Sequence, residues 1–455
     1  MNENKELFET MPVPKALATL AIPTIISQLI TMIYNFADTF FIGRTDNPYK
    51  VAAASLAYVL FFILTALSNL FGVGGGSLIS RLLGMRKGDE AKKVCSFSFY
   101  GTIIVSAIYS LVCLIFMEPI LRAVGASDNT IGYASAYTLW VIVVGGIPST
   151  LCMTMAHLLR SEGYAKQAGF GLGMGGLLNI VLDPLFMFVI MPAGYEVTGA
   201  AVATLLSNLI AFVYFIAAFL HYRKTTVLFM SPKLIFAGTK YIKEILAVGF
   251  PSALGSFLAS VSGMVVNGLA SGYGDIPVAA MGIVKKIEML PMNVGMGLCQ
   301  GMMPLVSYNY ASKDYKRMHS AANCARFSGM AFAVICIVCF EVFAGEIIGL
   351  FIGDSETISM GTNLLRICCI ATPVMICNFQ MSYTFQAMGK GPQSLLLSSC
   401  RQGLINIPLL FLMNYLFGLY GVAWTQLLAD GITLIISIVL YQNVYGKLKK
   451  ELQEI

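Results

Sequence analysis

The chain has 455 residues, of which 57% are hydrophobic and 11% charged, and its mean hydropathy is +0.77. A soluble domain of this size could not keep so much apolar surface away from water, so we interpret the chain as a membrane protein. Its net charge of +6 is attributed to membrane topology, which leaves a nucleic-acid partner without support.

Twelve apolar runs follow one another along the chain, each long enough for the ~20 residues that cross about 30 Å of hydrocarbon. The pattern predicts an all-α integral membrane protein with twelve transmembrane helices in two six-helix bundles. The first six runs cover about residues 15–42, 52–80, 95–117, 131–157, 168–191 and 198–220. The second six cover about residues 244–270, 278–308, 321–344, 358–386, 394–416 and 420–442.

The two sets of runs share landmarks in the same order. Their offset drifts only between 222 and 228 residues, and the matched pairs are Pro23 and Pro251, Gly72 and Gly297, Gly163 and Gly389, Asn179 and Asn406, and Gly199 and Gly421. Internal repeats of this kind recur in transporter folds. We therefore predict an N-terminal lobe at 1–220, a cytoplasmic linker at 221–243 and a C-terminal lobe at 244–455.

The distribution of basic residues predicts the orientation in the membrane. The termini and alternate loops hold 23 of the 29 Lys and Arg residues, with Arg160 and Arg401 counted among the loop positions. The positive-inside rule then places both termini in the cytoplasm, in agreement with an even number of helices. The first fourteen residues lack the basic start and short apolar core of a signal peptide.

Two acidic residues stand inside predicted spans of the first lobe. Asp183 in NIVLDP costs about 2.5–3.5 kcal/mol to insert, which favours a functional role. Asn179 lies one turn earlier on the same helical face, and Tyr34 precedes Asp38 by the same spacing. The carboxyl groups can exchange a proton or, with Asn179 and Thr204, supply oxygen ligands to Na⁺. A purely structural role in helix–helix hydrogen bonding is the alternative.

The second lobe lacks these acids. Leu410 corresponds to Asp183, and Val266 or Asn267 corresponds to Asp38, so ion coupling is assigned to the first lobe. Charged residues remain in the second lobe, where Glu288 can either neutralise Lys285 or contact a substrate. Asp430 can receive a cationic substrate or pair with a base of the same lobe.

Prolines and methionines mark further candidates. Pro23 and Pro184 lie near the acidic residues and are predicted to bend their helices, with static kinks as the alternative. The flexible side chains of methionine suit promiscuous apolar cations, although ordinary packing explains these residues equally well. The methionines considered for the cavity wall are Met281, Met289, Met292 and Met296.

No recognised motif of an enzyme or metal site is found. The eleven cysteines and three histidines lack zinc-ligand spacing, and neither HExxH nor GxSxG occurs. The glycine run GVGGGS at 72–77 is interpreted as close helix packing or local flexibility and not as a phosphate loop. We predict no enzymatic activity, no metal and no cofactor, with H⁺ or Na⁺ as the coupling ion.

The chain resembles the multidrug and toxic compound extrusion (MATE) family, and within it the MepA-like branch. The resemblance covers nearly the whole length and is carried by YNFADTFFIG in the first predicted helix, NLFGVGGGSLISRLLG in the second, NIVLDP in the fifth and GAAVAT in the sixth. It implies a V-shaped exporter in the bacterial cytoplasmic membrane that expels lipophilic, mostly cationic drugs in exchange for H⁺ or Na⁺. Membrane lipids are the other expected partners, and a monomer without an obligate protein partner is expected.

The resemblance also implies roles for individual residues. The ion-coupling network of the family falls here on Tyr34, Asp38, Tyr137, Asn179, Asp183 and Thr204, with Pro23 where the first helix bends. The seventh and tenth predicted helices carry no acidic residue, which argues against a second Na⁺ site in the C-terminal lobe. A lipid-linked saccharide flippase of the same superfamily is the alternative function. It would need a strongly cationic central cavity.

Overall fold

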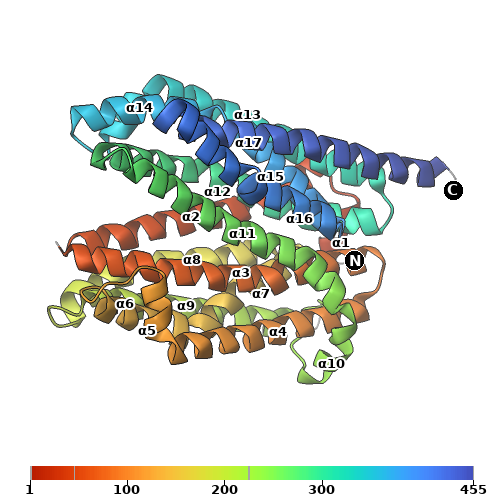
Figure 1. The fold of residues 1–455 in the computed structure, drawn as a ribbon. Coiled ribbons are helices and arrows are strands. Elements are labelled where there is room, and N and C mark those ends of the chain that lie inside the picture. The colour runs from red at the N-terminus through yellow and green to blue at the C-terminus, as the bar shows by residue number, and fades with distance from the viewer. Residues whose placement is uncertain (1–2, 46, 224–225, 454–455) are drawn as a thin grey trace.

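The computed structural model describes residues 3–45, 47–223 and 226–453. Within these residues every regular element is a helix, and the helices form two bundles, with α3 to α9 below and α12 to α17 above in Figure 1. The first bundle contains α1 (Glu3–Glu9), α2 (Val13–Gly43), α3 (Pro48–Gly84), α4 (Gly88–Ile115), α5 (Met117–Ala123), α6 (Ile131–Thr138), η1 (Leu139–Val144), α7 (Gly146–Ser161), α8 (Ala165–Leu185), η2 (Phe186–Ile190) and α9 (Glu196–Tyr222).

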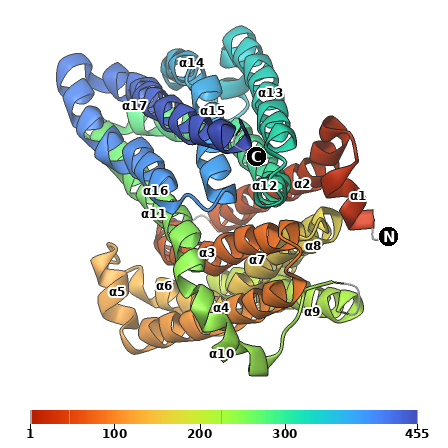
Figure 2. The same cartoon turned by 90° about the vertical axis from the view of Figure 1, so that its right-hand side faces the viewer.

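A short helical connection leads into the second bundle. It comprises η3 (Pro232–Leu234), α10 (Ile235–Gly238) and η4 (Thr239–Tyr241). The second bundle contains α11 (Ile242–Ser271), α12 (Asp275–Ala311), α13 (Tyr315–Gly349), α14 (Ser355–Cys369), α15 (Thr372–Ala387), α16 (Gly391–Ser399), η5 (Cys400–Leu404) and α17 (Asn406–Gln453). Figure 2 shows α2 and α11 between the two bundles.

By length and hydropathy, the described helices contain eight to ten of the twelve predicted crossings. Eight segments are long and apolar enough to span a membrane, and two bent pairs raise this number to ten. The bent pairs are Ile131–Val144 with Gly146–Ser161, at 51°, and Ser355–Cys369 with Thr372–Ala387, at 44°. The remaining two predicted crossings correspond to α12, with 37 residues, and to a second part of the segment Gly391–Leu448.

That second part is distinct because the chain doubles back within α17. Gly418 has a φ of +62°, a conformation that favours glycine. A Cβ atom on Gly421 would overlap the carbonyl oxygen of Met413, although eight residues of straight helix span about 12 Å. The chain therefore reverses at Gly418 and crosses a second time.

Glycines bring the two bundles into direct backbone contact. A Cβ atom on Gly249 of α11 would overlap the carbonyl oxygen of Leu70 on α3, and one on Gly74 would overlap that of Ile245. On the neighbouring pair of helices, Gly301 of α12 meets the backbone of Ala21 on α2 in the same way. The interpretation of GVGGGS as a close-packing segment is confirmed.

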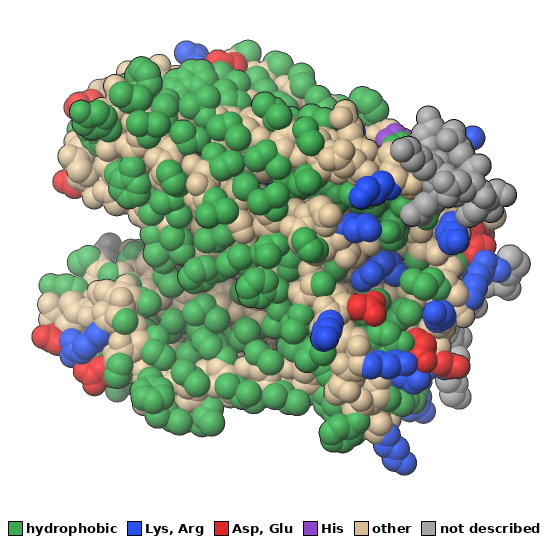
Figure 3. All heavy atoms as spheres, turned by 45° about the vertical axis from the view of Figure 1, so that its right-hand side comes forward, with side chains coloured by type: hydrophobic (Ala, Val, Ile, Leu, Met, Phe, Trp, Pro, Cys, Tyr) green, Lys and Arg blue, Asp and Glu red, His purple; other side chains and the backbone are tan. Residues whose placement is uncertain are grey.

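The two ends of the molecule differ in charge and shape. Figure 3 shows hydrophobic side chains along the sides, Lys and Arg gathered at one end, and a cleft between the bundles at the other. We call the end where Lys and Arg gather the basic end. Contacts between neighbouring segments assign to it the turns around Arg86, Glu162, Tyr241, Lys316 and Gly389. Both marked chain ends lie on this side of the molecule (Figure 1).

Candidate functional site

Six residues predicted for ion coupling converge inside the first bundle. Asn179 donates from Nδ2 to Oδ1 of Asp183 at 2.9 Å and to Oγ1 of Thr204 at 3.2 Å. Tyr137 hydrogen-bonds to Asp38 and also to Thr204, and the charges of Asp38 and Asp183 act on each other. The set joins four helices and consists of Tyr34 and Asp38 on α2, Tyr137 on α6, Asn179 and Asp183 on α8, and Thr204 on α9. We call it the N-lobe site.

Small residues on α8 allow the N-lobe site to assemble. A Cβ atom on Gly169 would lie 2.5 Å from the carbonyl oxygen of Pro23, and one on Gly176 would lie 2.9 Å from Cγ2 of Ile30. Because glycine permits this approach, α2 and α8 pack along much of their length. The close packing places the acidic residue of α2 beside that of α8.

The N-lobe site has more acceptors than donors. Asp183 is fully buried, and its Oδ2 atom has no hydrogen-bond partner among the described residues. The same holds for Oδ1 of Asp38 and Oδ1 of Asn179. Carboxylate and amide oxygens accept hydrogen bonds or coordinate cations, so the three atoms provide a place for a positive charge. No group of three His, Cys, Asp or Glu side chains among the described residues has the arrangement of a metal site.

The two prolines near this site differ in their effect. Pro184 stands at the end of α8 and is followed at once by the π-helical segment η2, so the helix geometry changes beside Asp183. Pro23 lies inside α2, which is a single helix from Val13 to Gly43 in this conformation. A bend at Pro23 stays a prediction about another state of the molecule.

A central cavity of about 390 Å³ lies between the two bundles. Tyr34, Asn179 and Thr204 line it, whereas Asp38 and Asp183 do not. The cavity thus shares three side chains with the N-lobe site. A change in the hydrogen bonds of that site can therefore reach a molecule in the cavity.

Three of the four predicted methionines, Met289, Met292 and Met296, line the cavity. The prediction for Met281 was wrong, since this residue is 1% exposed and packs in a hydrophobic core with Val284 and Leu364. Met281 stands eleven residues before Met292, about 16 Å along the helix axis. At that point α12 packs against α14 instead of facing the cavity.

Two pairs of opposite charges in the second bundle lie in contact. Lys285 Nζ lies 2.8 Å from a carboxylate oxygen of Glu288, as the charge-balance alternative predicted. Asp430 is fully buried and receives Arg401 Nε at 2.7 Å on Oδ1 and Gln426 Nε2 at 2.6 Å on Oδ2. Both of its oxygens have donors, so Asp430 pairs with a base.

The count of basic residues in the predicted loops included two arginines that the structure places in helices. Arg401 lies in η5 and is 7% exposed, and Arg160 lies in the last turn of α7 and is 3% exposed. Both line the central cavity, together with His157 and Gln300. The available sequence signal was the mostly apolar residues that precede each arginine, HLL before Arg160 and LLLSSC before Arg401.

The fold and the central cavity define a membrane transporter built from two repeated helical bundles. The family model MatE matches residues 23–185 and 251–412, one segment in each bundle. Curated relatives described as "Multidrug export protein MepA" come from Staphylococcus saprophyticus subsp. saprophyticus and from Staphylococcus aureus (strain MRSA252). Each is 32% identical over 456 residues, covering 100% of this chain and 99% of the relative.

Solved structures agree with this assignment at the level of the fold. A crystal structure described as "MATE in the straight conformation" has a TM-score of 0.92 at 24% identity, covering 99% of this chain and 100% of that chain. The chain therefore belongs to the MatE family, the multidrug and toxic compound extrusion transporters. It is a multi-pass membrane protein and a transporter, not an enzyme.

Proposed function

We propose that this transporter exports lipophilic, mostly cationic compounds in exchange for H⁺ or Na⁺, and that Asp38 and Asp183 bind the coupling ion. The cargo class is inferred from the relatives described as multidrug export proteins. The size of the central cavity and its Tyr, Phe and Met lining suit apolar small molecules. These full-length relatives leave no reason to prefer the saccharide flippase.

The main support is the set of buried oxygens without partners in the N-lobe site. Asp38, Asn179 and Asp183 each have one such atom, whereas both oxygens of Asp430 in the second bundle have donors. A bound proton or Na⁺ would satisfy these acceptors and alter the hydrogen bonds that hold Asn179 and Thr204 in the cavity wall. Ion binding and cargo binding then oppose each other, and this coupling is reciprocal.

Transport requires the cavity to open alternately at the two ends. We propose that residues 1–220 and 244–455 rock as lobes around the cavity, connected by 221–243, and that α2 bends near Pro23 during the cycle. The positive-inside rule assigns the basic end and both termini to the cytoplasm. With this orientation, the cleft in Figure 3 opens to the outside. Both binding regions lie within one chain, so a monomer suffices.

The test uses the full chain in lipid vesicles with an imposed pH gradient and a fluorescent lipophilic cation as cargo. The wild type is expected to move the dye, and Asp183→Asn and Asp38→Asn are expected to stop gradient-driven movement. The exposed Asp128→Asn serves as the matched control. Replacing the pH gradient by a Na⁺ gradient identifies the ion. Full movement by Asp183→Asn, or none by the wild type under either gradient, would contradict the proposal.

A further inference from the structure

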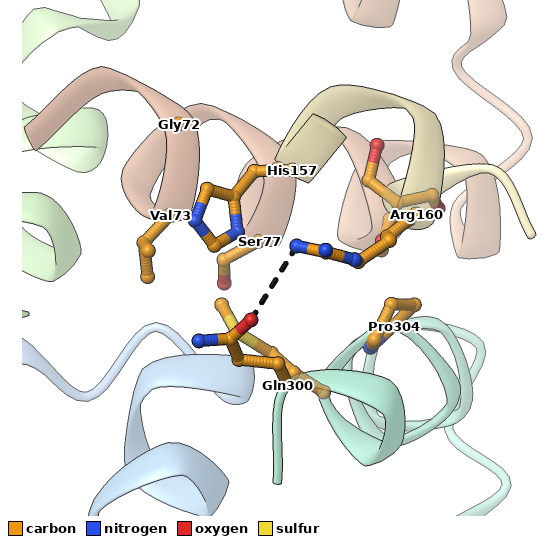
Figure 4. Close-up of a pocket in the computed structure, with 11 residues that line it drawn as sticks. Gly72, Val73, Ser77, His157, Arg160, Gln300 and Pro304 are labelled. Atoms are coloured by element: carbon orange, nitrogen blue, oxygen red, sulfur yellow. Dashed lines mark hydrogen bonds between the residues drawn. The ribbon is translucent and has the colours of Figure 1, made fainter. Parts of the chain in front are cut away.

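Arg160 occupies an unusual position at the bottom of the central cavity. It is carried by the last turn of α7, and its side chain extends between α3 and α12. Figure 4 shows Arg160 and His157 on one side of a small pocket and Gln300 on the other, with a single hydrogen bond from Nη1 of Arg160 to Oε1 of Gln300, at 3.4 Å. This contact is long for a charged donor.

The guanidinium group has no counter-charge. Its Nε and Nη2 atoms are buried and have no partner among the described residues, and no carboxylate there lies within ion-pair distance of it. Arg401, which lines the same cavity, is by contrast held by Asp430 at 2.7 Å. A buried cation without a partner is strongly unfavourable, so such a group is expected to hold an anion.

The surrounding pocket suits a single small ligand. Its volume is about 20 Å³, enough for one water-sized group. No Asp or Glu appears among the described residues that line either this pocket or the central cavity. The nearby hydroxyls already donate to carbonyl oxygens, Ser77 to Gln386 and Ser80 to Ser161, each at 2.7 Å. The unpartnered charged donors are therefore Nε and Nη2 of Arg160, and the ring of His157 lines the same pocket beside them.

We propose that this pocket binds one small monovalent anion, a halide ion or a single carboxylate group, on Nε and Nη2 of Arg160. The two atoms provide the paired donor geometry of a guanidinium fork, and one negative charge neutralises it. The anion also removes the uncompensated positive charge from the floor of the central cavity. If the proposed function is right, this neutralisation lets a lipophilic cation occupy the cavity above.

Salt-dependent unfolding of the purified full chain in lipid nanodiscs tests the site without any transport measurement. Melting temperatures are compared in sodium chloride, sodium acetate and sodium isethionate at equal ionic strength, since the bulky isethionate sulfonate exceeds the pocket. In the wild type we expect the melting temperature to rise and then saturate with chloride and with acetate, but not with isethionate. The reason is that a ligand that binds the folded state stabilises it. Arg160→Gln should weaken this binding about tenfold or more.

The exposed Arg44→Gln is the matched control, since it removes one positive charge away from the pocket and should behave like the wild type. Equal melting curves in the three salts, or the same chloride response in Arg160→Gln as in the wild type, would overturn the proposal. A comparison with sodium benzoate distinguishes a free ion from a carboxylate group carried by a larger molecule. Tighter binding of benzoate than of chloride identifies a carboxylate carried by a larger molecule, and the reverse order identifies a free ion.

A second measurement does not depend on the folding of a variant. Crystals of the wild-type protein grown with sodium bromide should show an anomalous scattering peak beside the Arg160 guanidinium. The lack of such a peak, with bromide at saturating concentration, would overturn the proposal.

Binding of the fluorescent cation to the wild type in sodium chloride and in sodium isethionate tests whether the bound anion affects cargo binding. Chloride is expected to raise the affinity for the fluorescent cation. Equal affinities would contradict this effect but not the salt-dependent evidence for the site.

Discussion

Three buried carboxyl groups in this chain have different partners. Asp430 has a donor on each oxygen, Asp183 has a donor on one only, and Glu162 accepts the backbone N–H of Val227 at 2.7 Å. The sequence predicted a role for Asp183 because an acid in an apolar run is costly and Asn179 stands one turn away. It left the role of Asp430 open, since Arg401 lies 29 residues earlier and only the tertiary contact brings the two together.

Glu162 leads to a prediction about pH and stability. It follows α7 at the basic end and is 5% exposed, and this burial raises the pKa of its carboxyl group to about 8. The unfolded chain has a glutamate pKa of about 4.3. Between these values the folded state binds the additional proton, so stability is highest below about pH 4 and falls as pH rises towards 8. Melting curves of the wild type from pH 5 to 8.5 should show this fall.

The variant Glu162→Gln should remove that part of the pH dependence. The amide oxygen can accept the same hydrogen bond from Val227 but does not ionise, so the variant should gain melting temperature over the wild type at pH 8.5 and match it at pH 5. Glu356→Gln, at an exposed position, is the control. Parallel curves for wild type and Glu162→Gln would show that the carboxyl group does not titrate as inferred.

At the scale of helices, glycine positions decide how closely elements approach. The repeat in the sequence aligned Gly72 with Gly297, but helix periodicity does not say which backbone each glycine meets. The structure shows α3 against α11 and α2 against α12, together with the glycine contacts of α8 on α2. The predicted run at 131–157 is likewise divided into α6, η1 and α7, with a π-helical segment before Gly145.

The contact of α3 with α11 provides a prediction with an internal control. Gly249→Ala places a methyl group against the carbonyl oxygen of Leu70, whereas Gly263→Ala on the same helix meets nothing within 4 Å. The first variant should lose about 1–3 kcal/mol of stability through overpacking. The second should be neutral or slightly stabilised by the higher helix propensity of alanine.

Thermal unfolding of both variants in nanodiscs checks this prediction. A loss in melting temperature confined to Gly249→Ala is the expected result. Equal melting temperatures for the two variants would show that α3 and α11 do not need backbone contact in the stable state.

At the scale of the whole molecule, α1 joins the two bundles across the basic end. Oε1 of Glu9 lies 2.7 Å from Nη2 of Arg86, in the turn after α3, and accepts the hydroxyl of Tyr308 on α12 at 2.5 Å. Phe8 stacks on the ring of Tyr308, and Arg317 donates to the carbonyl oxygens of Leu7, Phe8 and Met11. From these contacts we infer that α1 stabilises a closed basic end.

Removing the charge of Glu9 should loosen this closure. Ion pairs with exposed partners contribute about 0.2–1 kcal/mol, so Glu9→Gln should shift the ratio of closed to open molecules by a factor of about 1.4 to 5. Spin labels at the exposed positions of Lys87 and Lys316, one in each half, would report longer distances by pulsed electron paramagnetic resonance. Glu6→Gln, exposed on the same helix, should leave the distance distribution unchanged. Identical distributions for Glu9→Gln and the wild type would refute a closing role for α1.

The sequence by itself determined the membrane class, the positions of the helices and the repeat, because hydropathy and helical spacing are local properties. The same local reasoning identified Asp183 with Asn179 on one helix face. Tertiary structure alone decided that Met281 packs in a core and that Asp430 has a basic partner. It also decided that Arg160 is buried without one. These properties depend on contacts between segments far apart in the chain, and no periodicity within one segment encodes which partner it meets.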